Sequence, residues 1–183
     1  MKKRYYNWQD VSTAADAIMA DLAKDQWRPD YVVGITRGGL PLALLLSHRL
    51  GVRMETLKVA LRDGGESETN CWMSEDAFGY VDGENYANSD VYAKKNILVV
   101  DDINDTGATF AWIKQDWQSS CLPKNPNWDT VWGGNVRFAV MVENLSSEFS
   151  LTSYYWDTVN KADDDVWLVF PWEREAWLKP SME

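Results

Sequence analysis

Three carboxylates and a turn of small and hydroxylated residues stand close together in this chain. The stretch 96–110 reads NILVVDDINDTGATF, so Asp101 and Asp102 follow an apolar run and Asp105 precedes a Thr-Gly-Ala-Thr turn. Paired carboxylates accept hydrogen bonds from vicinal hydroxyls, or bind a hydrated Mg²⁺, which prefers oxygen ligands and keeps several waters. Without such donors or a cation, carboxylates this close would repel one another. The stretch therefore predicts a ligand site.

The elements around these carboxylates would position them at the edge of a sheet. The run 97–100 is apolar, rich in β-branched residues and too short for a helix, so it predicts a buried parallel strand. A helix is expected over 108–118, and the turn before it exposes N–H groups and hydroxyls that can hold a phosphate. A site that binds a phosphate, vicinal hydroxyls and a metal ion together suits an activated ribose phosphate.

A second glycine-bearing turn joins another strand to another helix. The segment 33–41 reads VGITRGGLP, in which Gly38 and Gly39 allow close backbone approach and Arg37 supplies a permanently charged, forked donor. This chemistry suits a pyrophosphate, although tight packing of a helix on a strand explains a glycine pair nearly as often. The segment is not a P-loop, because the Gly-Lys-Ser/Thr ending is missing.

The periodicity of the apolar residues predicts an α/β fold, with a central parallel sheet flanked by helices in a Rossmann-like arrangement. Both turns would then lie beyond the carboxyl ends of parallel strands, where such sheets bind ligands. A helix over 11–25 is expected to be capped by Asp10 or Ser12. The expected elements are helices over 11–25, 40–50 and 108–118, strands over 31–35, 53–61, 97–101 and 138–142, and short strands or a cap at 154–156 and 166–169.

The length of 183 residues predicts a single domain over 1–183. Residues 62–95 are polar, bear glycines and lack clear periodicity, which is typical either of a functional lid or of a plain flexible excursion. Residues 119–135 form another long connection, with two prolines and two glycines.

Composition excludes several classes of protein. The net charge of −10 argues against a nucleic-acid binder, because phosphate contacts along a strand need an excess of Lys and Arg. No apolar run approaches the length of a membrane span, and the polar start is not followed by a signal-peptide core, so we expect a cytoplasmic protein without membrane contact. Cys71 and Cys121 lie fifty residues apart and are expected to be free thiols.

The acidic stretch VVDDINDTGAT resembles the signature of the type I phosphoribosyltransferases, which bind 5-phosphoribosyl-1-pyrophosphate (PRPP). The segment 33–41 resembles the pyrophosphate loop of the purine phosphoribosyltransferases, and the two motifs stand in that family's order. The resemblance implies an enzyme that transfers the 5-phosphoribosyl group from PRPP to a nucleobase and releases pyrophosphate, as in purine salvage. It also implies Mg²⁺ as cofactor, a mobile hood over 62–95, a base-binding cap over 153–183, and a homodimer or higher homo-oligomer.

The same resemblance implies roles for individual residues. Asp105 would be the catalytic residue, because it would lie nearest the base and accept a proton from a ring nitrogen. Asp101 and Asp102 would hold the ribose hydroxyls and the metal, directly or through water. The residues expected to bind PRPP are Asp101, Asp102, Asp105, Thr106, Gly107, Ala108, Thr109, Arg37 and Gly38.

The segment 165–173, DVWLVFPWE, resembles the end of the xanthine/guanine phosphoribosyltransferases. By that resemblance Trp167 would stack on a purine, with Leu168 beside it presenting backbone groups, and Glu173 would complete the pocket. A Pro-Trp turn near a terminus is also typical of a packed cap, and Trp172 is expected in the core.

One position departs from the family's pattern. Those enzymes carry a lysine at the end of the strand matching 138–142, where it donates to the purine 6-oxo group, and this chain has Glu143 and Asn144 there. Asn can donate a hydrogen bond and an ionised Glu cannot. Either a 6-oxo purine is bound differently or the acceptor is another base, an amino-bearing one included. The alternatives are a phosphoribosyltransferase for a pyrimidine or other acceptor, and a non-catalytic PRPP-binding regulator.

Overall fold

A computed structural model describes residues 2–61, 64–79, 94–120 and 128–174. Five parallel strands form the central sheet in the order β3-β2-β4-β5-β6, which confirms the predicted α/β fold. The elements are β1 (Lys2–Tyr5), α1 (Trp8–Lys24), β2 (Tyr31–Thr36), α2 (Leu40–Leu50), β3 (Arg53–Lys58), α3 (Cys71–Phe78), β4 (Ile97–Asn104), α4 (Ala108–Ser120), β5 (Val136–Asn144), β6 (Thr152–Val159) and β7 (Val166–Val169).

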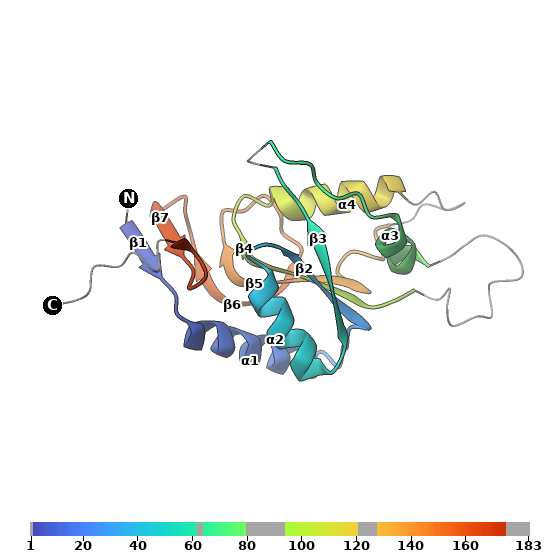
Figure 1. Cartoon of the computed structure of the whole chain (residues 1–183), viewed down its shortest axis with the longest axis horizontal. Helices are drawn as coiled ribbons and strands as arrows, with labels where there is room; N and C mark the ends of the chain where they lie inside the picture. Colours follow the sequence, from blue (N-terminus) through green and yellow to red (C-terminus); the bar gives the residue numbers. More distant parts are fainter. Residues whose placement is uncertain (1, 62–63, 80–93, 121–127, 175–183) are drawn as a thin grey trace, which may run out of the picture.

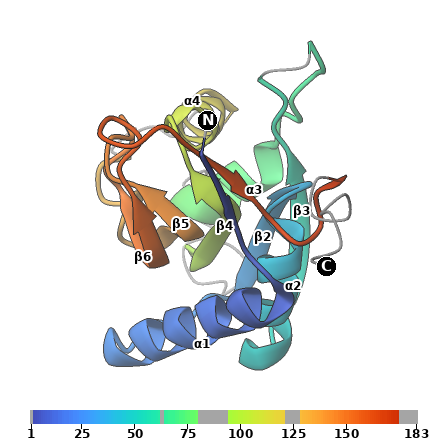
Figure 2. The ribbon, with the colours of Figure 1, turned by 90° about the vertical axis from the view of Figure 1, so that its left-hand side faces the viewer.

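Helices cover both faces of the sheet, with α1 and α2 on one face and α3 and α4 on the other (Figures 1 and 2). The central strands are apolar on both faces because each face is covered. In β4, for example, Leu98 and Val100 pack toward α1 and α2, whereas Ile97 and Val99 pack toward α3 and α4. This packing fixes the strands whose ends carry the two glycine-bearing turns.

The predicted helix over 40–50 is confirmed as α2, with Pro41 in its first turn and Gly51 after its end in the left-handed conformation (φ 64°). The predicted helix over 11–25 begins earlier, because Asn7 is its cap and forms a reciprocal capping box with Asp10. No helix in the described part of the chain has both the length and the apolar character needed to cross a lipid bilayer.

The predicted loop over 62–95 is wrong in one part, because it contains α3. Asn70 caps this helix by accepting a hydrogen bond from the N–H of Met73, and the helix buries Met73 and Ala77 beside α4. Eight residues give too short a pattern for the helical period to stand out in a polar segment. Residues 62–63 and 80–93, with Cys121, lie outside the described residues, and the hood over the reacting centre stays a prediction.

The predicted cap over 153–183 divides into two parts. Its beginning belongs to β6, which pairs with β5 as the edge strand of the central sheet. The strand β7 does lie apart, and it pairs in parallel with β1, where Trp167 is opposite Lys3. The sequence did not predict β1, since four exposed residues carry no period-2 apolar signal.

Candidate active site

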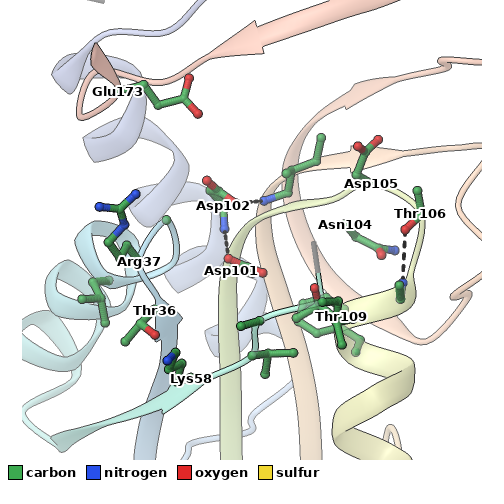
Figure 3. Close-up of a pocket in the computed structure, with 18 of the residues that line it drawn as sticks. Thr36, Arg37, Lys58, Asp101, Asp102, Asn104, Asp105, Thr106, Thr109 and Glu173 are labelled. Carbon is green, nitrogen blue, oxygen red and sulfur yellow. Dashed lines mark hydrogen bonds between the residues drawn. The ribbon is translucent and has the colours of Figure 1, made fainter. Parts of the chain in front are cut away.

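The carboxyl ends of β2, β3 and β4 meet the cap segment around one cavity of about 1420 Å³ (Figure 3). This is where parallel α/β sheets bind ligands. Every residue that the sequence predicts for PRPP binding lines this cavity, as do Trp167 and Glu173 from the predicted base site. The fold therefore brings together two motifs that are more than sixty residues apart in the chain; their roles stay proposals.

The two glycine-bearing turns are packed directly against each other. A Cβ atom added to Gly38 would lie 2.1 Å from Oδ2 of Asp102, and one added to Gly39 would lie 2.4 Å from a carbonyl oxygen of β4. Both distances are far below van der Waals contact. Backbone atoms surround Gly39, so glycine is required there, whereas a side chain at position 38 would displace the Asp102 carboxylate. The glycine pair thus serves the approach of the Arg37 turn to the carboxylates. Packing of α2 on the sheet depends instead on Gly34, whose added Cβ would lie 2.9 Å from the side chain of Ala43.

Asp101 and Asp102 form a half-buried acidic pair at the end of β4. The N–H of Asp102 donates to Oδ1 of Asp101, and the N–H of Ile103 donates to Oδ1 of Asp102, each at 2.9 Å. Burial, and then the charge of Asp102, raises the pKa of Asp101 well above its usual range. Burial raises the pKa of Asp102 to about 6, and the negative charge of Glu173 adds to the increase.

This acidic pair fits a magnesium ion. A cation would relieve the repulsion and the cost of burial that raise both pKa values. The described residues hold no cluster of three or more Asp, Glu, His or Cys side chains placed for a metal. A pair of carboxylates with open coordination positions suits Mg²⁺, which keeps waters and completes its shell with substrate oxygens.

The turn 106–109 leads into α4, and its geometry suits an anion. Gly107 has φ 89°, and an added Cβ would lie 2.6 Å from the backbone nitrogen of Phe149, so only glycine fits there. The hydroxyl of Thr106 accepts a hydrogen bond from the N–H of Ala108 at 3.4 Å. Since the first N–H groups of a helix lack intrahelical partners and carry its positive dipole, a phosphate is favoured at the start of α4.

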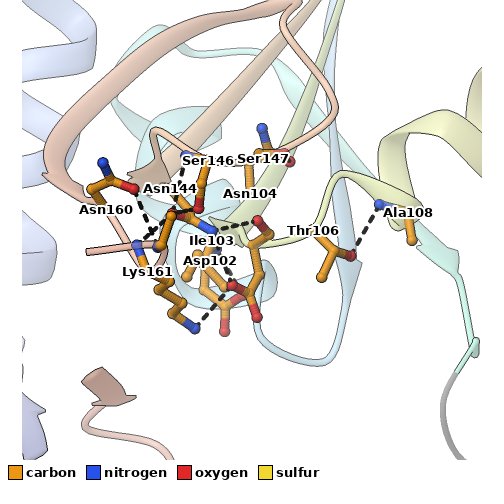
Figure 4. A network of polar contacts seen from close by, with 12 residues as sticks. Asp102, Ile103, Asn104, Thr106, Ala108, Asn144, Ser146, Ser147, Asn160 and Lys161 are labelled. Atoms are coloured by element: carbon orange, nitrogen blue, oxygen red, sulfur yellow. Dashed lines mark hydrogen bonds and ion pairs between the residues drawn. The ribbon is translucent and has the colours of Figure 1, made fainter. Parts of the chain in front are cut away.

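Asp105 contacts Asn144, at the end of β5, and Lys161, which follows β6; Figure 4 shows these two partners. Its Oδ1 forms an ion pair with Nζ of Lys161 at 2.9 Å, and its carbonyl oxygen accepts a hydrogen bond from the amide of Asn144 at 2.8 Å. The Asn144 side chain lines a smaller adjoining cavity instead of the main one. Glu143 is buried and turns to the side-chain amide of Asn104, 2.8 Å away. Glu143 and Asn144, at the end of β5, thus form hydrogen bonds with other groups of the protein.

The two tryptophans of the cap, Trp167 and Trp172, have different surroundings. Trp167 is 42% exposed and lines the cavity. Trp172 also reaches the cavity, but it stacks on Phe170 with ring centroids 5.1 Å apart and packs against the core. Leu168 buries its side chain, so only its backbone could serve a base. Glu173 lines the cavity, and its Oε2 accepts from the N–H of Phe170 at 3.2 Å.

Two lysines near the cavity were missed by sequence reasoning. Lys58 is the last residue of β3 and lines the cavity beside the Arg37 turn. Its position was inferable, because the carboxyl ends of parallel strands share one edge. Lys161 follows β6, whose end the sequence did not define, so no pattern in the sequence indicated that it reaches Asp105.

Comparison with known proteins agrees with this geometry. The model of the phosphoribosyl transferase domain matches residues 1–174. The chain therefore belongs to the phosphoribosyltransferase family, as the two motifs indicated.

The chain is similar to several purine enzymes of this family. The xanthine-guanine phosphoribosyltransferase of Idiomarina loihiensis is 23% identical over 171 residues, which cover 92% of this chain and 86% of the relative. The hypoxanthine-guanine phosphoribosyltransferase of Schizosaccharomyces pombe is 23% identical over 197 residues, covering 93% and 89%. At this identity the relatives are distant.

Solved structures show the same fold. The purine phosphoribosyltransferase from Pyrococcus horikoshii Ot3 superposes with a TM-score of 0.62 at 23% identity, covering 100% of this chain and 99% of that one. The xanthine-guanine-hypoxanthine phosphoribosyltransferase of Helicobacter pylori gives 0.62 at 16% identity, covering 96% and 95%. The likeness in fold extends over nearly all of this chain in both comparisons.

Proposed function

We propose that this protein transfers the 5-phosphoribosyl group from PRPP to a purine base and releases pyrophosphate, as in purine salvage. One observation carries the proposal: the two turns meet over the acidic pair in a single cavity, with Gly38 against Asp102. A phosphate site, a site for pyrophosphate and a site for a diol are thereby arranged around one sugar. Trp167, on the cap side, supplies a flat surface for a base.

The side chains divide the work by their chemistry. Arg37 and the backbone of Gly38 bind the pyrophosphate, and the turn 106–109 binds the 5′-phosphate through N–H groups and hydroxyls. As the bond from C1′ to the pyrophosphate oxygen breaks, a bond forms from C1′ to a ring nitrogen of the base. Asp105 accepts the proton that a ring nitrogen of the base loses in this step. The carboxylates of Asp101 and Asp102 stabilise the positive charge that develops on the ribose.

Asp101 and Asp102 are also the residues that would hold Mg²⁺, directly or through its waters. The ion would supply positive charge that neutralises the leaving pyrophosphate. The ribose hydroxyls donate to the same carboxylates, so the sugar is oriented by the pair. Self-association as a homodimer or higher homo-oligomer stays a prediction.

The test is an assay of pyrophosphate release from PRPP with Mg²⁺ and a panel of bases, comprising purines, pyrimidines and no base. Formation of a purine nucleoside monophosphate, identified by mass, is the expected result. Turnover of pyrimidines alone would move the protein to another acceptor class. PRPP binding without turnover of any base would instead support a regulatory protein, and absence of PRPP binding with Mg²⁺ would refute the whole assignment.

A further inference from the structure

We propose that Lys161 selects a 6-oxo purine by donating a hydrogen bond to its oxo group. The inference rests on the proposed function and names the substrate class of the same site. Where the family's pattern has a lysine at the end of the strand matching β5, this chain has an asparagine that anchors a lysine from the turn after the next strand, β6.

The anchor is a fixed set of hydrogen bonds. Oδ1 of Asn144 accepts from the backbone N–H of Lys161 at 3.0 Å, and the amide of Asn144 donates to the carbonyl of Asp105 at 2.8 Å (Figure 4). The side chain of Asn144 is buried, with 5% of the residue exposed, so water competes little for these bonds. Asn144 thus sets both Asp105 and Lys161 in place.

The ammonium and the carboxylate form a recognition pair. Nζ of Lys161 lies 2.9 Å from Oδ1 of Asp105, and each side chain is about a quarter exposed, at 23% and 24%. On a 6-oxo purine, N7 and O6 lie on the same edge of the base. An N7–H can donate to Asp105 while O6 accepts from Lys161, which has three N–H donors and so keeps its bond to the carboxylate.

This pairing discriminates by chemistry. An ammonium has donors and no acceptor, so it bonds an oxo group and opposes the N–H donors of a 6-amino group. A charge-assisted hydrogen bond contributes roughly 1.5–3 kcal/mol, which corresponds to about a tenfold to a hundredfold preference for the oxo base.

Lys161 lines the smaller cavity of about 720 Å³, which adjoins the main one at Asp105 and is also lined by the turn 106–108, so a phosphate could attract it. The experiment separates the two roles by comparing inosine and adenosine 5′-monophosphates, which share the ribose phosphate and differ at position 6 of the purine. Calorimetry on the full chain should give tighter binding of the inosine nucleotide. Lys161→Gln should lower the inosine affinity about tenfold to a hundredfold and leave the adenosine affinity unchanged or higher.

Lys161→Arg keeps the charge and the donors, so it should retain part of the preference. Lys95→Gln is the matched control, because Lys95 pairs with Asp76 at 3.1 Å just before β4, at the opposite end of that strand. This control should leave both affinities unchanged. Thermal unfolding of each variant verifies that it is folded.

Equal weakening of both nucleotides by Lys161→Gln would overturn the proposal and assign the lysine to the 5′-phosphate. An unchanged preference would overturn it as well. The pyrophosphate assay with hypoxanthine and adenine completes the set: turnover with selectivity unaltered in Lys161→Gln refutes only the role of the lysine. A wild-type protein that turns over no base refutes the proposed function, and the role of Lys161 in substrate selection with it.

Discussion

The proposed phosphate side and the proposed base side of the site are built in different ways. The phosphate side comes from two continuous stretches, 36–39 and 101–109, that follow adjacent strands and meet through glycine. The base side combines side chains from the ends of β5 and β6 and from the cap strand β7. Phosphate binding needs backbone N–H groups, which any sequence supplies once the glycines allow the turn. Base recognition needs particular side chains, so another strand can supply them.

The largest effect is expected at the junction of the two sides. Asp105→Asn removes the proton acceptor but keeps the size of the side chain, so turnover should fall by about 10²- to 10⁴-fold while PRPP binding persists. Asp16→Asn is the control, because Asp16 is an exposed partner of Arg49 outside the site. Steady-state kinetics with calorimetry of PRPP binding measures both quantities. Equal loss of rate and of affinity would make Asp105 a structural residue.

On the phosphate side, Gly38→Ala should weaken PRPP binding by roughly tenfold to a hundredfold, in line with an overpacking cost of about 1–3 kcal/mol. The new methyl would occupy the position of the Asp102 carboxylate, which can swing away, so the fold should survive. Gly51→Ala should have the opposite effect. An added Cβ at Gly51 would meet no atom within 4 Å, but the backbone there is left-handed, with φ 64°. Stability should therefore fall by about 1–2 kcal/mol, with PRPP affinity intact. Urea unfolding and PRPP calorimetry on both variants test this contrast. It would be contradicted if both variants lost PRPP affinity to the same extent, or if both lost only stability.

On the base side, Trp167→Ala should raise the KM for the base about tenfold, as expected from the loss of roughly 1–2 kcal/mol of base stacking. The KM for PRPP should not change. Trp172→Ala should mainly lower stability, by about 1–3 kcal/mol, because this ring stacks on Phe170 and packs against the core. Kinetics and thermal unfolding of both variants distinguish the two roles, and a reversed pattern would identify Trp172 as the stacking residue.

The smallest effect concerns stability. The pKa of Asp102 is raised to about 6 in the folded chain, above the value of about 3.9 for an ordinary aspartate. Between these values the folded chain holds a proton that the unfolded chain has lost, so stability decreases as the pH rises through this interval. Without Mg²⁺ and PRPP, Asp102→Asn should therefore be more stable by about 1–2 kcal/mol near pH 7.5, with little gain near pH 4. Urea unfolding at both pH values would contradict this if the gain were absent or independent of pH.

Local patterns predicted most of the fold. The helix 40–50 and the strand 166–169 have the predicted bounds, because proline, glycine and a continuous apolar run mark their ends. The predicted start of α1 was wrong because Asn7 caps this helix before its apolar face begins. The strand β1 was not predicted because it forms through pairing with β7. The helix α3 is held by its contacts with α4 and was not predicted.

For the candidate site, the sequence by itself determined the two turns and the three carboxylates, because backbone conformation and charge in a short motif are local properties. Tertiary structure alone decided that Gly38 meets Asp102, that Asn144 contacts Asp105, and that Lys161 crosses from β6 to the same carboxylate. These contacts depend on which strands are neighbours in the sheet. Strand order follows from the burial of all the apolar faces at once, and no single segment encodes it.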